Sequence, residues 1–457
     1  MRLMLVFLCI LMLLTVVVQA EAPVFHTNPA PIKDIGDPFI LHAEGAYWHF
    51  STTGGIAFSA RRSEDLETWG KPVWAYVPGK DSWGVKDFWA PEVYEVDGAY
   101  YLFYSARWKE NDSLRIGVAR ADRPEGPYTD ITQGPLFDFG YAAIDAHVLF
   151  GEGQAYLYYA RDCSENVVDG RHESHLYGIR LAPALDAVEG EPVQLTRPDQ
   201  PWEMASGPEW LWNEGAYVLK DGGKYWLFYS ANFYAGKEYG VGAAWAEHPL
   251  GPYTKLAQNP LLSYVEHDGE VLLSGPGHNS FFTVGDELYT AYHTHVVPKN
   301  PSGYRQTAFD RVGFTAQGMP YINGPTTTSQ LPPLALHGLT NHLAQAVPDD
   351  EGSALLMDGD QGMGSADKEG RYAQQTRYGW TWEEPVALKH LALYAHSEVP
   401  VQGRFVLGDK SEPFTLEPGD GALGVHWSSG LDGAVTRLEL VWEGEPPRAF
   451  ELMAVGE

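Results

Sequence analysis

The sequence predicts an all-β protein, a five-bladed β-propeller followed by a jelly-roll-like β-sandwich. Three observations lead to this prediction. Five stretches repeat a short apolar strand, a turn and an aromatic strand; apolar residues nowhere keep a helical spacing over any length; and the repeat stops near residue 330. The length of 457 residues suits one large β domain followed by a smaller one.

The first twenty residues are predicted to be a cleaved signal peptide. Arg2 precedes an apolar run from Leu3 to Val18, and a small residue, Ala20, stands directly before Glu21. A membrane anchor is the alternative, but the run is shorter than the roughly 20 residues that a spanning helix needs. We therefore expect export to the periplasm or the extracellular space, with no membrane insertion after cleavage.

The composition limits the choice of partners. The chain carries 31 basic and 60 acidic side chains, a formal net charge of -29, which repels nucleic acid and anionic surfaces. A neutral ligand is therefore favoured. Of the two cysteines, Cys9 lies in the predicted leader, so Cys163 has no partner for an intrachain disulfide and is expected to be a small buried side chain.

Each repeat has an apolar first strand, a turn with Gly or Asp, and a second strand rich in Tyr, Trp and Phe. The five copies are DPFILHAEGAYWHFST from Asp37, APEVYEVDGAYYLFYSA from Ala90, IDAHVLFGEGQAYLYYA from Ile144, NEGAYVLKDGGKYWLFYSA from Asn213 and GHNSFFTVGDELYTAYHTH from Gly277. A β-sandwich would not explain five copies in one register, whereas a propeller repeats one unit radially. Because the first strand of each blade lines the channel, the residues that open the copies should meet at one end of it.

A proline-rich stretch at 331–333 marks the predicted boundary between a propeller at 21–330 and a sandwich at 331–457. Beyond it, YGWTWEEPVALKHLALYA and VTRLELVWEG alternate apolar and polar residues as strands do. Their order resembles galactose-binding-like, discoidin-type jelly rolls. Trp380, Trp382 and Trp427 could stack on sugars, but packing in the core or between domains is the favoured interpretation.

A carboxylate opens one of the copies and stands second in two others. Asp37 lies 10 residues before Tyr47, whereas Asp145 and Glu214 each lie 11 residues before a tyrosine. One such acid would be read as a turn residue, but three in matching register predict a crowded site in which at least one pKa is raised. A metal site is one use of clustered acids. Hydrolysis of a glycosidic bond is the other, since it needs one carboxyl as acid and another as base or nucleophile.

At these positions the chain resembles glycoside hydrolase family 43, the five-bladed propeller enzymes that act on arabinose- and xylose-containing plant polysaccharides. The matching features cover about residues 30–330 and are DP at Asp37, WAPE at 89–92, ID at 144–145, EG at 214–215, GHNS at 277–280, and DRVGF followed by YINGPT from Asp310.

The resemblance implies roles for five residues. Asp37 would be the general base, Glu214 the general acid, and Asp145 the group that orients Glu214 and tunes its pKa, with inversion of the anomeric configuration. Arg305 would hydrogen-bond sugar hydroxyls or hold a carboxylate ionised. Trp89 would stack on the sugar, although core packing explains it equally well.

The resemblance also implies a calcium ion beside His278, held largely through water molecules. The alternative is a hydrogen-bonded histidine with no ion, since a lone histidine is weak evidence of a metal. No organic cofactor is expected.

The sequence thus predicts an exported glycoside hydrolase that acts on a carbohydrate, releasing α-L-arabinofuranose from the ends of neutral plant polysaccharides or oligosaccharides. A β-D-xylosidase or a β-D-galactofuranosidase using the same site is the first alternative. A propeller that binds carbohydrate or proteins without catalysis is the second.

Overall fold

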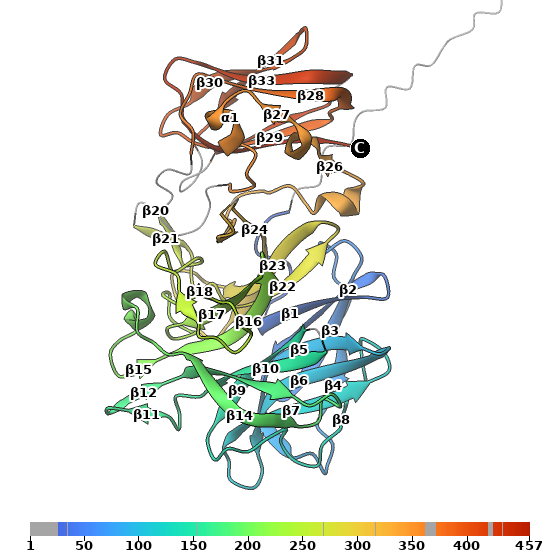
Figure 1. Cartoon of the computed structure of the whole chain (residues 1–457), viewed down its shortest axis with the longest axis vertical. Coiled ribbons are helices and arrows are strands. Elements are labelled where there is room, and N and C mark those ends of the chain that lie inside the picture. Colours follow the sequence, from blue (N-terminus) through green and yellow to red (C-terminus); the bar gives the residue numbers. More distant parts are fainter. Residues whose placement is uncertain are drawn as a thin grey trace, which may run out of the picture.

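The protein is described by a computed structural model (Figure 1). The predicted signal peptide at 1–20 lies outside the described residues. These are 26–33, 35–151, 153–267, 269–315, 317–361, 372–418, 424–431 and 433–457.

Each sequence repeat forms one antiparallel sheet of four strands in the described part of the chain. The first sheet contains β1 (Gly36–Ala43), β2 (Ala46–Thr53), β3 (Ala57–Ser63) and β4 (Val73–Tyr76). The second contains β5 (Gly84–Val96), β6 (Ala99–Trp108), β7 (Leu114–Ala121) and β8 (Thr129–Asp130). The third contains β9 (Ala143–Gly151), β10 (Gln154–Arg161), β13 (His175–Leu181) and β14 (Val188–Thr196).

The remaining two repeats follow the same plan. The fourth sheet contains β16 (Asn213–Asp221), β17 (Lys224–Ala231), β18 (Gly240–Ala246) and β19 (Thr254–Lys255). The fifth contains β22 (Gly277–Val284), β23 (Glu287–His295), β24 (Arg305–Phe314) and β25 (Pro320–Ile322). Smaller elements join the sheets: β11 (Val167–Val168), β12 (Arg171–Glu173), β15 (Trp210–Leu211), β20 (Val265–His267), β21 (Glu270–Leu273) and the 3-10 turn η1 (Pro201–Met204).

Two-residue turns join the first two strands of each sheet. In the turns Glu44-Gly45 and Asp97-Gly98 both residues have positive φ, between 52° and 74°. This is the backbone of a type I′ hairpin, whose twist matches that of the flanking strands and which favours Gly and Asp. These Gly and Asp turns therefore set the register of the two hairpins.

The sheets close into a ring. The first strands contact one another in the order β1, β5, β9, β16, β22 and back to β1. Five apolar clusters each join neighbouring sheets, and one of them joins Phe282 and Phe309 of the last sheet to Ile40 and Tyr47 of the first. The backbone closes the ring as well, because Thr307 of β24 donates its N–H to the oxygen of Ile32 at 3.1 Å.

The C-terminal part is a sandwich of two sheets, drawn in orange and red at one end of the molecule in Figure 1. One sheet contains β26 (Thr340–Asn341), β34 (Arg448–Gly456), β29 (His390–His396) and β32 (Gly424–Ser429). The other contains β27 (Val347–Pro348), β28 (Arg377–Ala387), β33 (Ala434–Glu443), β30 (Val401–Leu407) and β31 (Lys410–Leu416). Helical turns are η2 (Leu334–His337), η3 (His342–Gln345) and α1 (Glu351–Leu355).

The sandwich tryptophans take the packing role favoured by the sequence. Trp380 and Trp382 are buried in the core between the two sheets. Trp427 packs edge to face on Tyr394, with ring centroids 6.4 Å apart. The predicted all-β fold, a propeller followed by a sandwich, is confirmed, and the expected boundary at residue 330 falls in the connection between β25 and β26.

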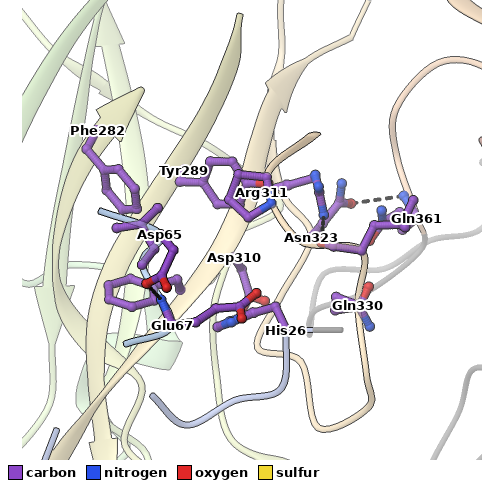
Figure 2. A pocket seen from close by; sticks show the side chains of 14 residues that line it. His26, Asp65, Glu67, Phe282, Tyr289, Asp310, Arg311, Asn323, Gln330 and Gln361 are labelled. Atoms are coloured by element: carbon purple, nitrogen blue, oxygen red, sulfur yellow. Dashed lines mark hydrogen bonds between the residues drawn. The ribbon is translucent and has the colours of Figure 1, made fainter. Parts of the chain in front are cut away.

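A polar joint connects the propeller to the sandwich. Arg311, on β24, donates from Nε to Glu287 Oε1 and from its two Nη atoms to the oxygens of Leu331 and Pro332, each at 2.8 Å. Figure 2 shows Arg311 beside Asn323, whose side-chain oxygen accepts the N–H of Gln361 at 2.9 Å. A small cavity of about 20 Å³ beside Arg311 has room for about one water molecule.

We predict that Arg311→Ala lowers the free energy of unfolding by about 3 kcal/mol, because it leaves a carboxylate and two carbonyls without their buried cation. Urea unfolding measures the change. The matched control is Arg62→Ala, which removes an exposed ion pair with Glu64 at 2.8 Å and should change stability by less than about 0.5 kcal/mol. An equal decrease in the free energy of unfolding for both substitutions would show that the hydrogen bonds of Arg311 stabilise the protein no more than an exposed ion pair does.

Candidate active site

A bulge in every first strand builds the site. At this point the strand skips two residues in its pairing with the second strand. The first skipped residue has a left-handed backbone, with φ of 54°, 49°, 61°, 57° and 51° at Asp37, Ala90, Asp145, Gly215 and His278. Because a bulge re-aims side chains, it turns these positions toward one end of the ring.

The predicted register of Glu214 is wrong by one residue. Gly215, not Glu214, occupies the bulge position of Asp37 and Asp145, and Glu214 shares the preceding position with Trp89. The count to a tyrosine misled because the second strands carry aromatic residues at neighbouring positions. A count to the end of the first strand is constant, since Asp37, Asp145 and Gly215 each lie six residues before it.

All six predicted site residues line one cavity of about 240 Å³. They are Asp37, Trp89, Asp145, Glu214, His278 and Arg305. Sequence reasoning missed the other six residues of the lining, which are Ile144, Asp162, Trp212, Phe233, Tyr234 and Tyr239. The cavity therefore brings together acidic groups from three sheets with aromatic side chains around them.

Asp37 is held in its ionised form. Arg305 Nη1 donates to Asp37 Oδ1 at 2.9 Å, and Thr52 Oγ1 donates to Oδ2 at 2.5 Å. His278 Nδ1 lies 3.4 Å from Oδ1. Burial by itself raises the pKa of Asp37, but the Arg305 guanidinium and the His278 imidazole outweigh it and hold this pKa well below its usual range. Asp37 is thus a carboxylate at neutral pH.

His293 contacts the backbone of Asp37, and its imidazole is neutral. Its Nδ1 accepts the backbone N–H of Asp37 at 3.3 Å, so the ring proton is assigned to Nε2. Burial, with Arg305 adding to it, lowers the pKa of His293 to about 3. The imidazole stacks in parallel on Tyr239, at a centroid distance of 5.4 Å. His293 therefore connects the Asp37 side of the cavity with the Glu214 side.

Glu214 has the opposite environment. Tyr239 Oη donates to Glu214 Oε1 at 2.9 Å. Burial, followed by the charge of Asp145, raises the pKa of Glu214 well above its usual range despite this hydrogen bond. Glu214 thus keeps its proton at a pH where Asp37 has lost its own.

Asp145 lies next to Glu214 through the backbone. Its Oδ2 accepts the N–H of Gly215 at 3.1 Å, and its own N–H is donated to Ser105 Oγ at 2.9 Å. Burial raises the pKa of Asp145 to about 6, His278 opposes the rise, and Asp37 adds to it. Glycine suits position 215, because a Cβ atom there would lie 3.2 Å from His278 Nδ1, although residues other than glycine adopt the same left-handed backbone at the other four bulges.

Arg305 reaches Asp37 because the chain leaves it room. A Cβ atom on Gly36 would stand 2.1 Å from the guanidinium, so a larger residue there would displace Arg305 from this position. The guanidinium also lies over the Tyr234 ring, 4.9 Å from its centroid. Arg305 is therefore fixed between an aromatic face and the carboxylate that it keeps ionised.

A directly coordinated calcium ion does not fit the residues found around His278. No group of three or more His, Cys, Asp or Glu side chains in the described part of the chain could hold a metal ion. His278 Nδ1 instead faces Asp37. The backbone N–H of His278 is donated to Ser230 Oγ at 2.7 Å. An ion held through water beside His278 stays a prediction.

Tyr239 lies directly before β18, outside the repeats, and had no signal there. His293 lies in a second strand, within the YHTH that ends the fifth repeat, and the sequence did not separate a role in the site from packing between blades. Trp212 did leave a signal in the sequence, because the two tryptophans of Trp210-Leu211-Trp212 alternate with a leucine just before Glu214. In the structure Leu211 is buried and Trp210 is exposed. Cys163 is buried and free, as expected.

Comparison with known proteins decides the family. The sequence model of Glycosyl hydrolases family 43 matches residues 26–320. The chain belongs to glycoside hydrolase family 43. A crystal structure of a thermostable family-43 glycoside hydrolase is 40% identical to this family 43 enzyme, with a TM-score of 0.64, and the match covers 67% of this chain and 99% of that one.

Curated relatives of this family 43 enzyme have different names. A β-D-galactofuranosidase of Aspergillus niger is 27% identical over 313 residues, which cover 64% of this chain and 83% of that protein. An extracellular exo-α-(1→5)-L-arabinofuranosidase of Streptomyces avermitilis is 27% identical over 335 residues, which cover 68% of this chain and 66% of that protein. Within the described ranges, this glycoside hydrolase has no helix that is long and apolar enough to cross a membrane.

Proposed function

We propose that this glycoside hydrolase is an exported, exo-acting and inverting enzyme that releases α-L-arabinofuranose from neutral plant polysaccharides or oligosaccharides. The observation that carries the proposal is the contrast between two carboxyl groups in one cavity. Asp37 has its pKa held low by Arg305, and Glu214 has its pKa raised by burial and by Asp145. Environments that push two carboxyl pKa values apart assign a base and an acid.

In the proposed reaction Asp37 takes a proton from a water molecule, whose oxygen attacks the anomeric carbon. Glu214 gives its proton to the glycosidic oxygen as the bond to the anomeric carbon breaks. Asp145 orients Glu214 through Gly215 and raises its pKa. Arg305 keeps Asp37 ionised, and Trp89 offers an aromatic face to the bound sugar.

The name of the Streptomyces relative supports arabinofuranose, exo action and export. The Aspergillus relative favours β-D-galactofuranose as the second candidate, and β-D-xylose is the third. Hydrolysis of 4-nitrophenyl α-L-arabinofuranoside, β-D-galactofuranoside and β-D-xylopyranoside decides among them. Turnover of none of the three would favour a propeller that binds sugars without catalysis.

Further measurements test the remaining parts of the proposal. Proton NMR of the first product, before mutarotation, gives the anomeric configuration and so tests inversion. Release of long oligosaccharides alone from debranched arabinan would overturn exo action. Melting temperatures in calcium chloride and in chelator, for wild type and His278→Ala, test whether an ion is held beside His278 through water; equal temperatures would argue against it.

We predict a bell-shaped pH dependence of kcat/KM with widely separated limbs. Protonation of Asp37 removes the base, and since its pKa is low, activity falls only in strong acid. Deprotonation of Glu214 removes the acid, and since its pKa is raised, activity persists well above the usual range of a glutamate. In Arg305→Met the acid limb should move to higher pH, because the cation that lowers the pKa of Asp37 is gone. An unmoved acid limb would mean that Asp37 does not set it.

A further inference from the structure

A line of aromatic side chains leads out of the cavity. Trp212, Phe233 and Tyr234 belong to the cavity lining, and Trp210 lies beyond them on β15. Leu211 between the two tryptophans is buried, whereas 42% of Trp210 is exposed. The alternation of a strand therefore places both indoles on one side.

Successive ring contacts connect this line. The His172 and Trp210 rings lie face to face, with centroids 3.8 Å apart and planes 7° apart. Centroid distances are 6.5 Å from Trp210 to Trp212, 5.7 Å from Trp212 to Phe233, and 5.0 Å from Phe233 to Tyr234. We name His172, Trp210, Trp212, Phe233 and Tyr234 the aromatic row.

The outer end of the row is held in place. β12 pairs in parallel with β15, and His172 lies directly opposite Trp210. The imidazole Nδ1 of His172 donates to the backbone oxygen of Cys163 at 2.7 Å. The backbone N–H of His172 is donated to the backbone oxygen of Glu209 at 2.9 Å. The imidazole therefore backs one face of the Trp210 indole and fixes its orientation at the surface.

Exposure distinguishes the row from core packing. Phe233 and Tyr234 are 42% and 40% exposed, close to the value of Trp210, although buried sites for aromatic side chains are plentiful in the propeller. Exposed aromatic rings that continue a cavity wall are typical of a binding surface. The C–H faces of sugar rings are apolar and pack on aromatic faces while their hydroxyls stay in water.

We propose that the aromatic row is an outer subsite for the sugar units that follow the scissile bond, with Trp210 at its far end. The inference rests on the proposed glycosidase function, because it takes the cavity as the place where the bond is cleaved. The ligand is the continuing chain of a neutral oligosaccharide or polysaccharide, since a net charge of -29 disfavours an acidic one. Longer substrates should therefore be preferred to short ones.

The test compares kcat/KM for a substrate that reaches the row with kcat/KM for one that does not. The short substrate is the 4-nitrophenyl glycoside that wild type hydrolyses, and the long one is the linear pentasaccharide of the same sugar. If wild type hydrolyses no glycoside, the pentasaccharide used for binding is that of arabinofuranose. In Trp210→Ala the ratio of long to short should fall by about tenfold, the loss of one aromatic stacking contact. His172→Ala should lower the same ratio by a smaller factor. Trp74→Ala, an indole 56% exposed on β4, is the matched control and should leave the ratio unchanged.

Binding of the pentasaccharide, measured by isothermal titration calorimetry, separates the two proposals. If wild type hydrolyses no glycoside but Trp210→Ala weakens pentasaccharide binding about tenfold, the glycosidase proposal fails and the sugar-binding row stands. If wild type is active and Trp210→Ala leaves the ratio of long to short substrate unchanged, the proposed outer subsite is wrong and the glycosidase proposal stands. Equal losses on short and long substrates would also overturn the row.

Discussion

Asp37→Asn is expected to lower kcat/KM by about 10³-fold, whichever leaving group the substrate carries. The amide has nearly the shape of the carboxylate but cannot take a proton from the attacking water, and general base catalysis contributes about 10²- to 10⁴-fold. Because the base acts on water and not on the leaving group, a 4-nitrophenyl glycoside and an oligosaccharide should lose the same factor. Steady-state kinetics on both substrates measures this.

The control for Asp37→Asn must separate lost chemistry from lost structure. The substitution leaves the Arg305 cation without its partner, so the variant should melt at a lower temperature and is assayed where it is folded. Asp310 is the matched control, because it is equally buried, accepts hydrogen bonds from Thr326, and lines the cavity at the joint instead. Asp310→Asn should affect stability while activity per folded molecule stays near wild type. Activity of Asp37→Asn within tenfold of wild type would exclude Asp37 as the base.

The fold could be predicted from the sequence because each repeat contains the local signals that specify its own β-hairpin. Two-residue turns with Gly or Asp, and second strands dense in aromatic residues, specify a hairpin locally. Five such hairpins in one order leave few ways to bury their apolar faces except against one another. The apolar cluster of Phe282, Phe309 and Ile40, which joins the last sheet to the first, follows from that requirement.

From the repeats alone, the site was predictable only where its residues open the first strands, whereas Arg305, on β24, was predicted from the family resemblance. Asp37 and Asp145 could be placed from the repeats, because both sit at the same bulge. Glu214 was assigned to the wrong register, because the bulge is invisible in sequence and the aromatic marker shifts by a residue. Tyr239 could not be found and the role of His293 could not be decided, since both depend on how neighbouring sheets are packed around the ring.

Glu214→Gln is expected to lower kcat/KM for an oligosaccharide by about 10³-fold, but for a 4-nitrophenyl glycoside by only about tenfold. A sugar alkoxide is a poor leaving group and needs the proton of Glu214, whereas 4-nitrophenolate leaves with little help. This dependence on the leaving group would separate the proposed acid, Glu214, from the proposed base, Asp37. Parallel kinetics of the two variants on both substrates provides the comparison.

The pH profile of Glu214→Gln is an independent test of Glu214 as the general acid. Wild type loses activity on the alkaline side as Glu214 gives up its proton, so the variant should lose that limb and keep the acid limb set by Asp37. Tyr239→Phe is the matched control, because it removes the hydrogen bond to Glu214 Oε1 but leaves the carboxyl in place. Without that bond to the ionised form, the pKa of Glu214 should rise further and the alkaline limb should move to higher pH. A leaving-group effect without any change in the alkaline limb would mean that another group sets this limb, and Asp145, with a pKa of about 6, would then be the first carboxyl to test.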